Sequence, residues 1–199
     1  LNDPKLKLKG VYRTCIFVPA AVSMVASAVI FRSLFAADGF VNSILVNVGI
    51  LQTGYNFLGH PSSARIILMM VRVWKMLGYQ MIFYLAALQG IDSTIYEAAK
   101  IDGATGLQQF FKITIPMLKP TMVFTVVMSV NAAIQVYDES VNLTNGGPGN
   151  ATMPIAHYIY RLAFNGVPNF GYACALSMVV LVVVGAMAII QMKVGDRRE

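Results

Sequence analysis

Three polar side chains that could bind a polar solute recur at helical spacing inside an otherwise apolar stretch. They are Asn131, Gln135 and Asp138, at positions i, i+4 and i+7. This spacing predicts that they share one face of a helix, where amide and carboxylate groups can donate and accept hydrogen bonds. Polar groups persist in a membrane helix where an aqueous path or a neighbouring helix satisfies them. Two interpretations follow: the lining of a solute path, or hydrogen bonds between helices.

Aromatic side chains accompany an amide group in a second apolar stretch, residues 66–91. Tyr79, Phe83 and Tyr84 are predicted to share a helix face, with Gln80 nearby. Aromatic rings beside amides suit sugars, since C–H groups pack on the rings while hydroxyls need hydrogen-bond partners. Ordinary packing between helices is the alternative interpretation.

Two cations, Arg72 and Lys75, flank Trp74 near the outer end of the same stretch. We expect their long side chains to extend to the membrane interface beside the tryptophan. An ion pair within the complex is the alternative.

Motifs for catalysis or metal binding are absent from the sequence. It contains no G-x-x-x-x-G-K-[ST] phosphate loop, no H-E-x-x-H and no G-x-S-x-G. His60 and His157 stand alone, and Cys15 and Cys174 lie in apolar stretches that are typical of buried thiols. We therefore expect no enzyme activity, no metal site and no cofactor in this chain.

The composition indicates a protein that has lipid as its solvent. Of its 199 residues, 57% are hydrophobic and 12% are charged, against roughly 25% charged in soluble domains. A helix needs about 20 apolar residues to cross a bilayer core. Four stretches qualify, at about 14–31, 66–91, 120–137 and 172–192. The predicted fold is an all-α, polytopic helical bundle in a membrane.

The distribution of basic residues predicts the orientation. Four spans place the loops alternately on two sides, and ten Lys and Arg residues fall on one side against three on the other. The side with ten should be cytoplasmic, which also places the C-terminus there. The net charge of +6 is therefore explained by topology rather than by nucleic-acid binding. The ten are Lys5, Lys7, Lys9, Arg13, Lys100, Lys112, Lys119, Lys193, Arg197 and Arg198.

A charged segment broken by glycine, residues 92–119, joins the second span to the third on the cytoplasmic side. Gly103 suits a left-handed helix end, and Pro116 and Pro120 are expected to end the helix that follows. The segment should form two short helices that bend at Gly103, and these could bind another protein or rest on lipid headgroups. Each helix is predicted to begin with a capping box, Thr94-x-x-Glu97 in the first and Thr105-x-x-Gln108 in the second.

The stretch "EAAKIDGATGLQQFFKITIPMLKP" resembles the EAA loop of ABC-importer permeases. Other stretches, "RTCIFVPAAVS", "VRVWKMLGYQMIFYLAALQGI", "LTNGGPGNATMP" and "FGYACALSMVV", resemble the sugar-transport branch, which includes the maltose transporter membrane subunits. The resemblance covers nearly the whole chain. The residues that match the EAA pattern are Glu97, Ala98, Ala99, Gly103, Ile113 and Pro116.

The resemblance implies one permease domain over residues 1–199, N-terminally incomplete, with four of six spans. It implies a multi-pass protein of a bacterial or archaeal inner membrane that acts with a second permease, two ATPase subunits and an extracytoplasmic solute-binding protein. ATP and Mg²⁺ would be bound by the ATPases. Residues 92–119 would form a coupling helix seated on an ATPase, with polar contacts from Glu97 and Asp102 and a sugar as cargo.

Two other functions remain open from the residues. One is an importer of the same class for a non-sugar solute, such as a polyol or glycerophosphodiester. The other is a channel or ion-driven carrier without an ATPase, which would need ionisable groups deep in its spans.

Overall fold

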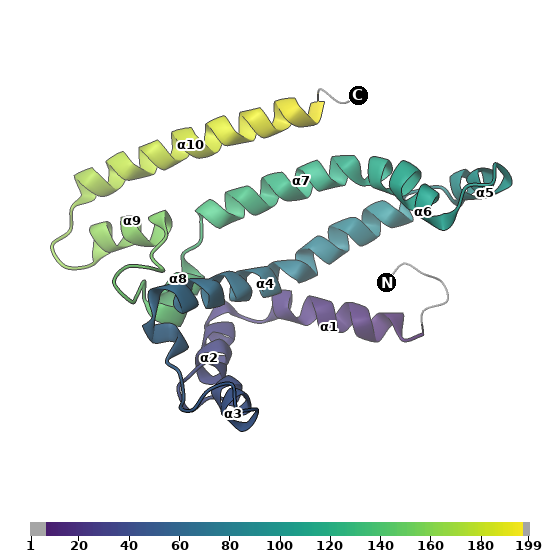
Figure 1. Cartoon of the computed structure of the whole chain (residues 1–199). Coiled ribbons are helices and arrows are strands. Elements are labelled where there is room, and N and C mark those ends of the chain that lie inside the picture. The colour runs from purple at the N-terminus through teal and green to yellow at the C-terminus, as the bar shows by residue number, and fades with distance from the viewer. Residues whose placement is uncertain (1–6, 197–199) are drawn as a thin grey trace.

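The computed structural model describes the backbone of residues 7–196 and the side chains of residues 7–193, and within this part the chain forms helices joined by turns and loops (Figure 1). No strand forms within that part, and the predicted all-α fold is confirmed. The α-helices are α1 (Lys9–Ala21), α2 (Met24–Leu34), α3 (Phe40–Asn47), α4 (Pro61–Gln89), α5 (Ser93–Ile101), α6 (Gly106–Gln109), α7 (Ile115–Ile134), α8 (Asp138–Thr144), α9 (Ile155–Phe164) and α10 (Phe170–Asp196). A 3₁₀ turn, η1 (Phe57–Gly59), and a π-helical turn, η2 (Phe110–Thr114), complete them.

Among the described residues, three helices are long and apolar enough to cross a membrane: Pro61–Gln89, Gly106–Ile134 and Phe170–Lys193. The bent pair of α1 and α2 can supply a fourth span. Figure 1 shows the beginning of α1, α5 and the end of α10 at one end of the bundle, with α2, α3, α8 and α9 at the other. The described basic residues of the predicted cytoplasmic side therefore lie together at the first end.

The stretch predicted as the first span, 14–31, is divided between two helices whose axes differ by 100°. Val22 ends α1 in an extended conformation, and the Ser23 side chain accepts a hydrogen bond from the Ala26 N–H to begin α2. A serine at this position satisfies a backbone donor that the first turn leaves without a partner. Apolar composition alone did not reveal the break, because both helices are equally lipid-like.

The backbones of α1 and α4 approach closely at Gly78. A Cβ atom on this buried glycine would lie 2.9 Å from the Ala20 Cβ and 3.0 Å from the Ile16 carbonyl oxygen. Small residues permit such contacts between membrane helices. At the other end of α4, its side chains contribute to an apolar core with α2 and α8, formed by Phe31, Ile67, Val71 and Leu143.

The segment from Gly106 to Ile134 is one run of helix, formed by α6, η2 and α7. The expectation that Pro116 and Pro120 end a separate short helix is wrong. In η2 the Ile115 N–H bonds to the Phe110 carbonyl five residues back. Pro116 falls in the first turn of α7, directly after this turn, where the regular pattern is already interrupted. The third span therefore begins inside the predicted coupling segment rather than at residue 120.

Candidate functional site

The first candidate site is the element of α5 and α6 at the end of the bundle. Asp92, rather than Thr94, caps α5: its carboxylate accepts the Thr94 N–H at 2.9 Å. The predicted capping box of Thr94 and Glu97 is therefore wrong, because Asp92 two residues earlier satisfies the first turn. This hydrogen bond lowers the pKa of the Asp92 carboxyl below its ordinary value.

The bend between α5 and α6 follows the prediction. Gly103 has a φ of +78°, and no atom lies within 4 Å of a Cβ built on it. The requirement for glycine is therefore conformational rather than steric. The capping box of Thr105 and Gln108 is confirmed, since the Thr105 N–H bonds to the Gln108 Oε1 at 2.8 Å.

The surface of this element is almost entirely uncovered. The helix α5 buries none of its residues, and the side chain of Ile101 is 87% exposed. Leu107 is 73% and Phe111 62% exposed beyond the bend. Apolar side chains of this kind on a charged element mark a surface that another molecule covers. The predicted coupling residues Glu97, Ala98, Asp102, Gly103 and Pro116 are exposed, while Ala99 and Ile113 are half-buried.

Within this element α6 is the beginning of the helical run that continues through η2 into α7, and α5 contacts that run through side chains. The Tyr96 hydroxyl forms a hydrogen bond of 2.8 Å with the Thr114 hydroxyl in η2. The Gln109 amide donates to the Ala104 carbonyl at 3.3 Å. A force applied to α5 or α6 therefore reaches α7 through η2.

The second candidate site is the polar end of α7. The prediction that Asn131, Gln135 and Asp138 share one helix face is wrong, because α7 ends at Ile134 and Asp138 begins α8. The Gln135 and Asp138 side chains are exposed, and Asn131 is half-buried. The Asn131 Oδ1 is buried and has no hydrogen-bond partner in the described part of the chain. A buried amide oxygen of this kind can accept a hydrogen bond from a solute hydroxyl or water.

The predicted aromatic cluster of α4 is divided between two neighbouring helices. The Tyr79 hydroxyl faces α1, where it donates to the Ala20 carbonyl at 3.4 Å. Tyr84 and Gln80 face α7 instead: the Tyr84 hydroxyl lies 2.9 Å from the Thr125 hydroxyl, and the Gln80 amide donates to the Ser129 hydroxyl at 2.7 Å. Gln80 and Tyr84 thus join α4 to α7 by hydrogen bonds as well as by the ordinary packing that was the alternative interpretation.

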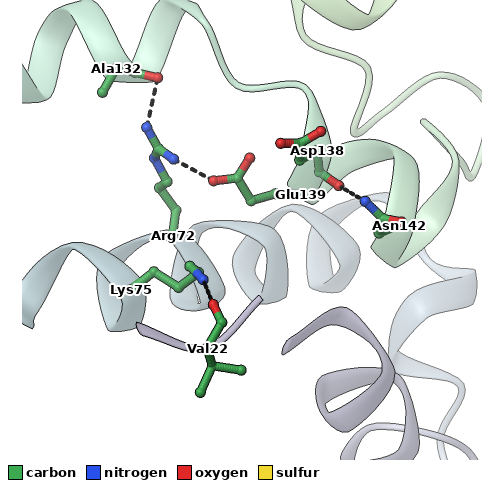
Figure 2. A network of polar contacts seen from close by, with 7 residues as sticks. All are labelled: Val22, Arg72, Lys75, Ala132, Asp138, Glu139 and Asn142. Carbon is green, nitrogen blue, oxygen red and sulfur yellow. Dashed lines mark hydrogen bonds and ion pairs between the residues drawn. The ribbon is translucent and has the colours of Figure 1, made fainter. Parts of the chain in front are cut away.

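The side chains of Arg72 and Lys75 point toward neighbouring segments of the chain and form hydrogen bonds with their backbone carbonyls (Figure 2). Arg72 forms an ion pair with Glu139 of α8 and donates to the Ala132 carbonyl of α7 at 2.8 Å. Lys75 donates to the Val22 carbonyl, at the bend between α1 and α2. The expectation that both cations extend to the membrane interface is wrong. Sequence reasoning missed Glu139, although an acid beside a membrane span containing an arginine was the available signal.

The loop after α8 is held by buried hydrogen bonds. The Ser140 hydroxyl donates to the Thr152 carbonyl and lies 2.8 Å from the His157 Nδ1. Thr152 in turn donates to the Gly147 carbonyl at 2.7 Å. Gly146 has a φ of +82°, and a Cβ there would lie 2.7 Å from Met153. The sequence "NGGPGN" therefore folds as an ordered loop on α8 and α9.

Lowering the pH is expected to loosen this loop through His157. Burial lowers the pKa of the His157 imidazole, and the nearby Arg161 lowers it further. In the unfolded chain the imidazole has its ordinary pKa of 6.5, and in the folded protein its pKa is lower. The neutral ring therefore contributes its full stability to the fold above pH 6.5, and this contribution is lost as the pH falls through the pKa of the folded protein. The protection factors of residues 140–157 in the full-length protein, which compare each exchange rate with the intrinsic rate at the same pH, should therefore be lower at about pH 5.5 than at about pH 7.5.

A matched pair of substitutions tests this expectation. His157→Asn retains a side-chain partner for Ser140 but cannot titrate, so the pH dependence of the protection factors should disappear. His60→Asn alters the chain's other histidine, which is exposed and stacks on the Tyr55 ring, and the dependence should persist. Equal pH dependence in the wild type and His157→Asn would contradict the assignment.

Comparison with known proteins gives a family and close relatives. Residues 2–196 match the family described as "Binding-protein-dependent transport system inner membrane component". The chain is 42% identical, over its whole length and 67% of the relative's, to the lactose transport system permease protein LacF of Rhizobium radiobacter. It is 36% identical to the trehalose/maltose transport system permease protein MalF of Thermococcus litoralis, again over its whole length and 66% of the relative's.

Comparison with solved structures also points to a transporter. The chain matches a bacterial alginate ABC transporter in complex with an alginate pentasaccharide-bound periplasmic protein, with a TM-score of 0.83 and 28% identity. The match covers 94% of this chain and 66% of that one. The chain thus spans about two thirds of the length of the proteins it matches.

Proposed function

This chain belongs to the family of binding-protein-dependent transport system inner membrane components, and from this membership we propose that it lines the path of an ATP-driven sugar importer. The names of the relatives support a sugar or oligosaccharide as cargo, since they include permeases for lactose and for trehalose and maltose. The three apolar helices and the bent pair support a multi-pass location in the inner membrane. Energy would come from separate ATPase subunits, so that this chain itself is not an enzyme.

The observation that carries the proposal is the uncovered surface of α5 and α6. Ala98 is small and exposed, Ile101 is 87% exposed, and Glu97 and Asp102 offer charge at the same surface. A cleft on a cytoplasmic ATPase would cover the apolar groups and pair the acids. Closure of two ATPases on ATP and Mg²⁺ would then move α6, η2 and α7 together. In this proposed arrangement α5 and the C-terminus would lie in the cytoplasm.

Two further partners complete the proposed assembly. A second, homologous permease would form the other wall of the path. An extracytoplasmic binding protein would deliver the sugar at the opposite end of the bundle, where α8, α9 and their loop lie (Figure 1). The transporter whose structure matches this chain was solved with a periplasmic protein that carries an alginate pentasaccharide.

The path itself would include the polar end of α7. Asn131 has a buried oxygen without a partner, and the exposed Gln135 and Asp138 lie on either side of the turn that follows. Tyr79, Gln80 and Tyr84 would shape the path indirectly, because their polar atoms contact α1 and α7.

Sugar-dependent ATP hydrolysis tests the proposal. The full-length complex would be reconstituted in proteoliposomes and supplied with a panel of mono- and oligosaccharides, in the presence and in the absence of its binding protein. One sugar should raise hydrolysis by about tenfold, only when the binding protein is present. Hydrolysis that ignores every sugar, with the ATPases still bound, would contradict the sugar assignment. Purification without any ATPase would contradict the importer and favour a channel or carrier.

A further inference from the structure

Arg72 joins two helix ends that lie on either side of one short turn. Its guanidinium donates to the Ala132 carbonyl near the end of α7 and to the Glu139 carboxylate in the first turn of α8 (Figure 2). Only residues 135–137 separate the two helices. One side chain from α4 therefore holds both sides of the corner at which α7 becomes α8.

The charges at this corner agree with the dipoles of the two helices. The last carbonyls of α7 carry partial negative charge and lack regular partners, so a cation is favourable there. The first turn of α8 carries partial positive charge, which favours the acid Glu139. Arginine fits both ends at once because its guanidinium presents several donors in a fixed plane, whereas the lysine ammonium is a single point of charge.

The burial of the pair indicates a requirement for geometry. The Glu139 side chain is 3% exposed and that of Arg72 is 27% exposed. Apolar residues of similar volume commonly stabilise a buried position as well as an ion pair does, so an ion pair is retained where it fixes one arrangement. An ionisable residue within a membrane span is by default a sign of function.

The corner is also fixed from its outer side. Ser140, the neighbour of Glu139, donates to the Thr152 carbonyl of the ordered loop and contacts His157 of α9. The turn that carries Gln135 is thus held by α4 on one side and by the loop and α9 on the other. Asn131 lies one residue before the Ala132 carbonyl that Arg72 binds, in the same last turn of α7.

We propose that Arg72 and Glu139 are positioning residues of the path: they fix the α7–α8 corner and thereby place Asn131 and Gln135 relative to α4. The inference rests on the proposed function for its link to sugar, and it names residues that act through others rather than by contact with the cargo. The inference requires that sugar affinity depend on the contacts of the Arg72 guanidinium with Ala132 and Glu139, and that another positive charge at position 72 not restore it.

Arg72→Lys is the decisive variant. Lysine retains a positive charge beside Glu139, so the complex should assemble in normal amounts, but a single ammonium cannot replace the planar fork that spans both helix ends. We expect the KM of sugar uptake to rise by about tenfold with Vmax within about twofold of the wild type. Glu139→Gln should give the same pattern. Arg32→Gln, which removes an exposed cation from α2, should change neither constant.

A second measurement reports the corner without any cargo. Asn131→Cys places a thiol at a half-buried position of α7, and its rate of alkylation in the full-length complex is read by mass spectrometry of this chain. Release of the corner by Arg72→Lys should raise the rate by about threefold or more, since opening exposes the thiol. Arg32→Gln should leave it unchanged.

The two measurements separate the inference from the proposed function. Unchanged alkylation and unchanged KM in Arg72→Lys and Glu139→Gln would overturn the inference. Reduced amounts of complex in Glu139→Gln, with Arg72→Lys normal in both measurements, would show a structural role only and would also overturn it. If the wild type transports no sugar, the proposed function fails, and the alkylation rate alone then decides: faster reaction supports the positioning role, and an unchanged rate overturns it.

Discussion

Ala98→Trp is expected to abolish sugar-stimulated ATP hydrolysis and to release the ATPase subunits, while the permease chain stays folded. Ala98 is exposed on α5, and this helix buries none of its residues, so a larger side chain there does not have to enter a packed region of the chain. In the proposed complex the same face fits into the ATPase cleft. Overpacking a closely fitted region costs about 1–3 kcal/mol, so we expect binding to weaken by about 30-fold. Co-purification of the ATPases and their sugar-dependent turnover measure the effect.

Ser93→Trp is the matched control for this substitution. Ser93 is also exposed on α5 and lies five residues before Ala98, about 140° around the helix. Tryptophan there should leave binding and turnover near wild type. Equal loss in both variants would mean that α5 tolerates no tryptophan at all, and normal turnover in Ala98→Trp would contradict the proposed coupling surface.

Gly78→Leu is expected to prevent accumulation of folded protein. A single Cβ at this position would already lie 2.9 Å from Ala20, 3.0 Å from the Ile16 carbonyl oxygen and 3.2 Å from the Phe17 Cα. Two of these three atoms are backbone, so α1 must move away from α4 to admit any side chain. Overpacking by one or a few methylenes costs about 1–3 kcal/mol, and leucine adds more. The yield of monodisperse complex in detergent measures the loss.

A smaller substitution keeps this prediction testable. Gly78→Ala should lower the Tm of the complex by several degrees, and the second change Ala20→Gly should restore part of the loss because it removes the nearest atom. Ala28→Gly provides the control, since Ala28 is likewise buried but lies on α2; it should not compensate. Equal Tm values for wild type and Gly78→Ala would show that the helices approach less closely than described.

Local sequence signals predicted local features of the fold well. Gly103 and the Thr105–Gln108 capping box were recognised because both depend on residues within a few positions. The family assignment, drawn from the EAA pattern, was also confirmed. By contrast, the N-cap of α5 was misplaced, because Asp92 and Thr94 are both good caps and the sequence does not rank them.

Features that depend on distant residues were not predictable from the sequence. The apolar pattern of α7 continues through Val136 and Tyr137, so nothing local ends the helix at Ile134. The last turn of α7 is bound by Arg72, which lies 60 residues earlier than the carbonyl to which it donates. The division of the predicted aromatic cluster was unpredictable for the same reason. The partners of Gln80 and Tyr84 on α7 are Ser129 and Thr125, whose hydroxyl groups do not stand out in the sequence.

The unbroken run of α6, η2 and α7 has a mechanical consequence. At 1.5 Å per residue, its 29 residues form a rod of about 43 Å, with the uncovered apolar residues at one end and the corner held by Arg72 at the other. A rod pivoting near one end enlarges a small rotation into a displacement, so a tilt of about 5° would move the far end by about 4 Å. A displacement of about 4 Å exceeds the length of a hydrogen bond. The helix is therefore long enough to act as a lever that opens or closes a solute path.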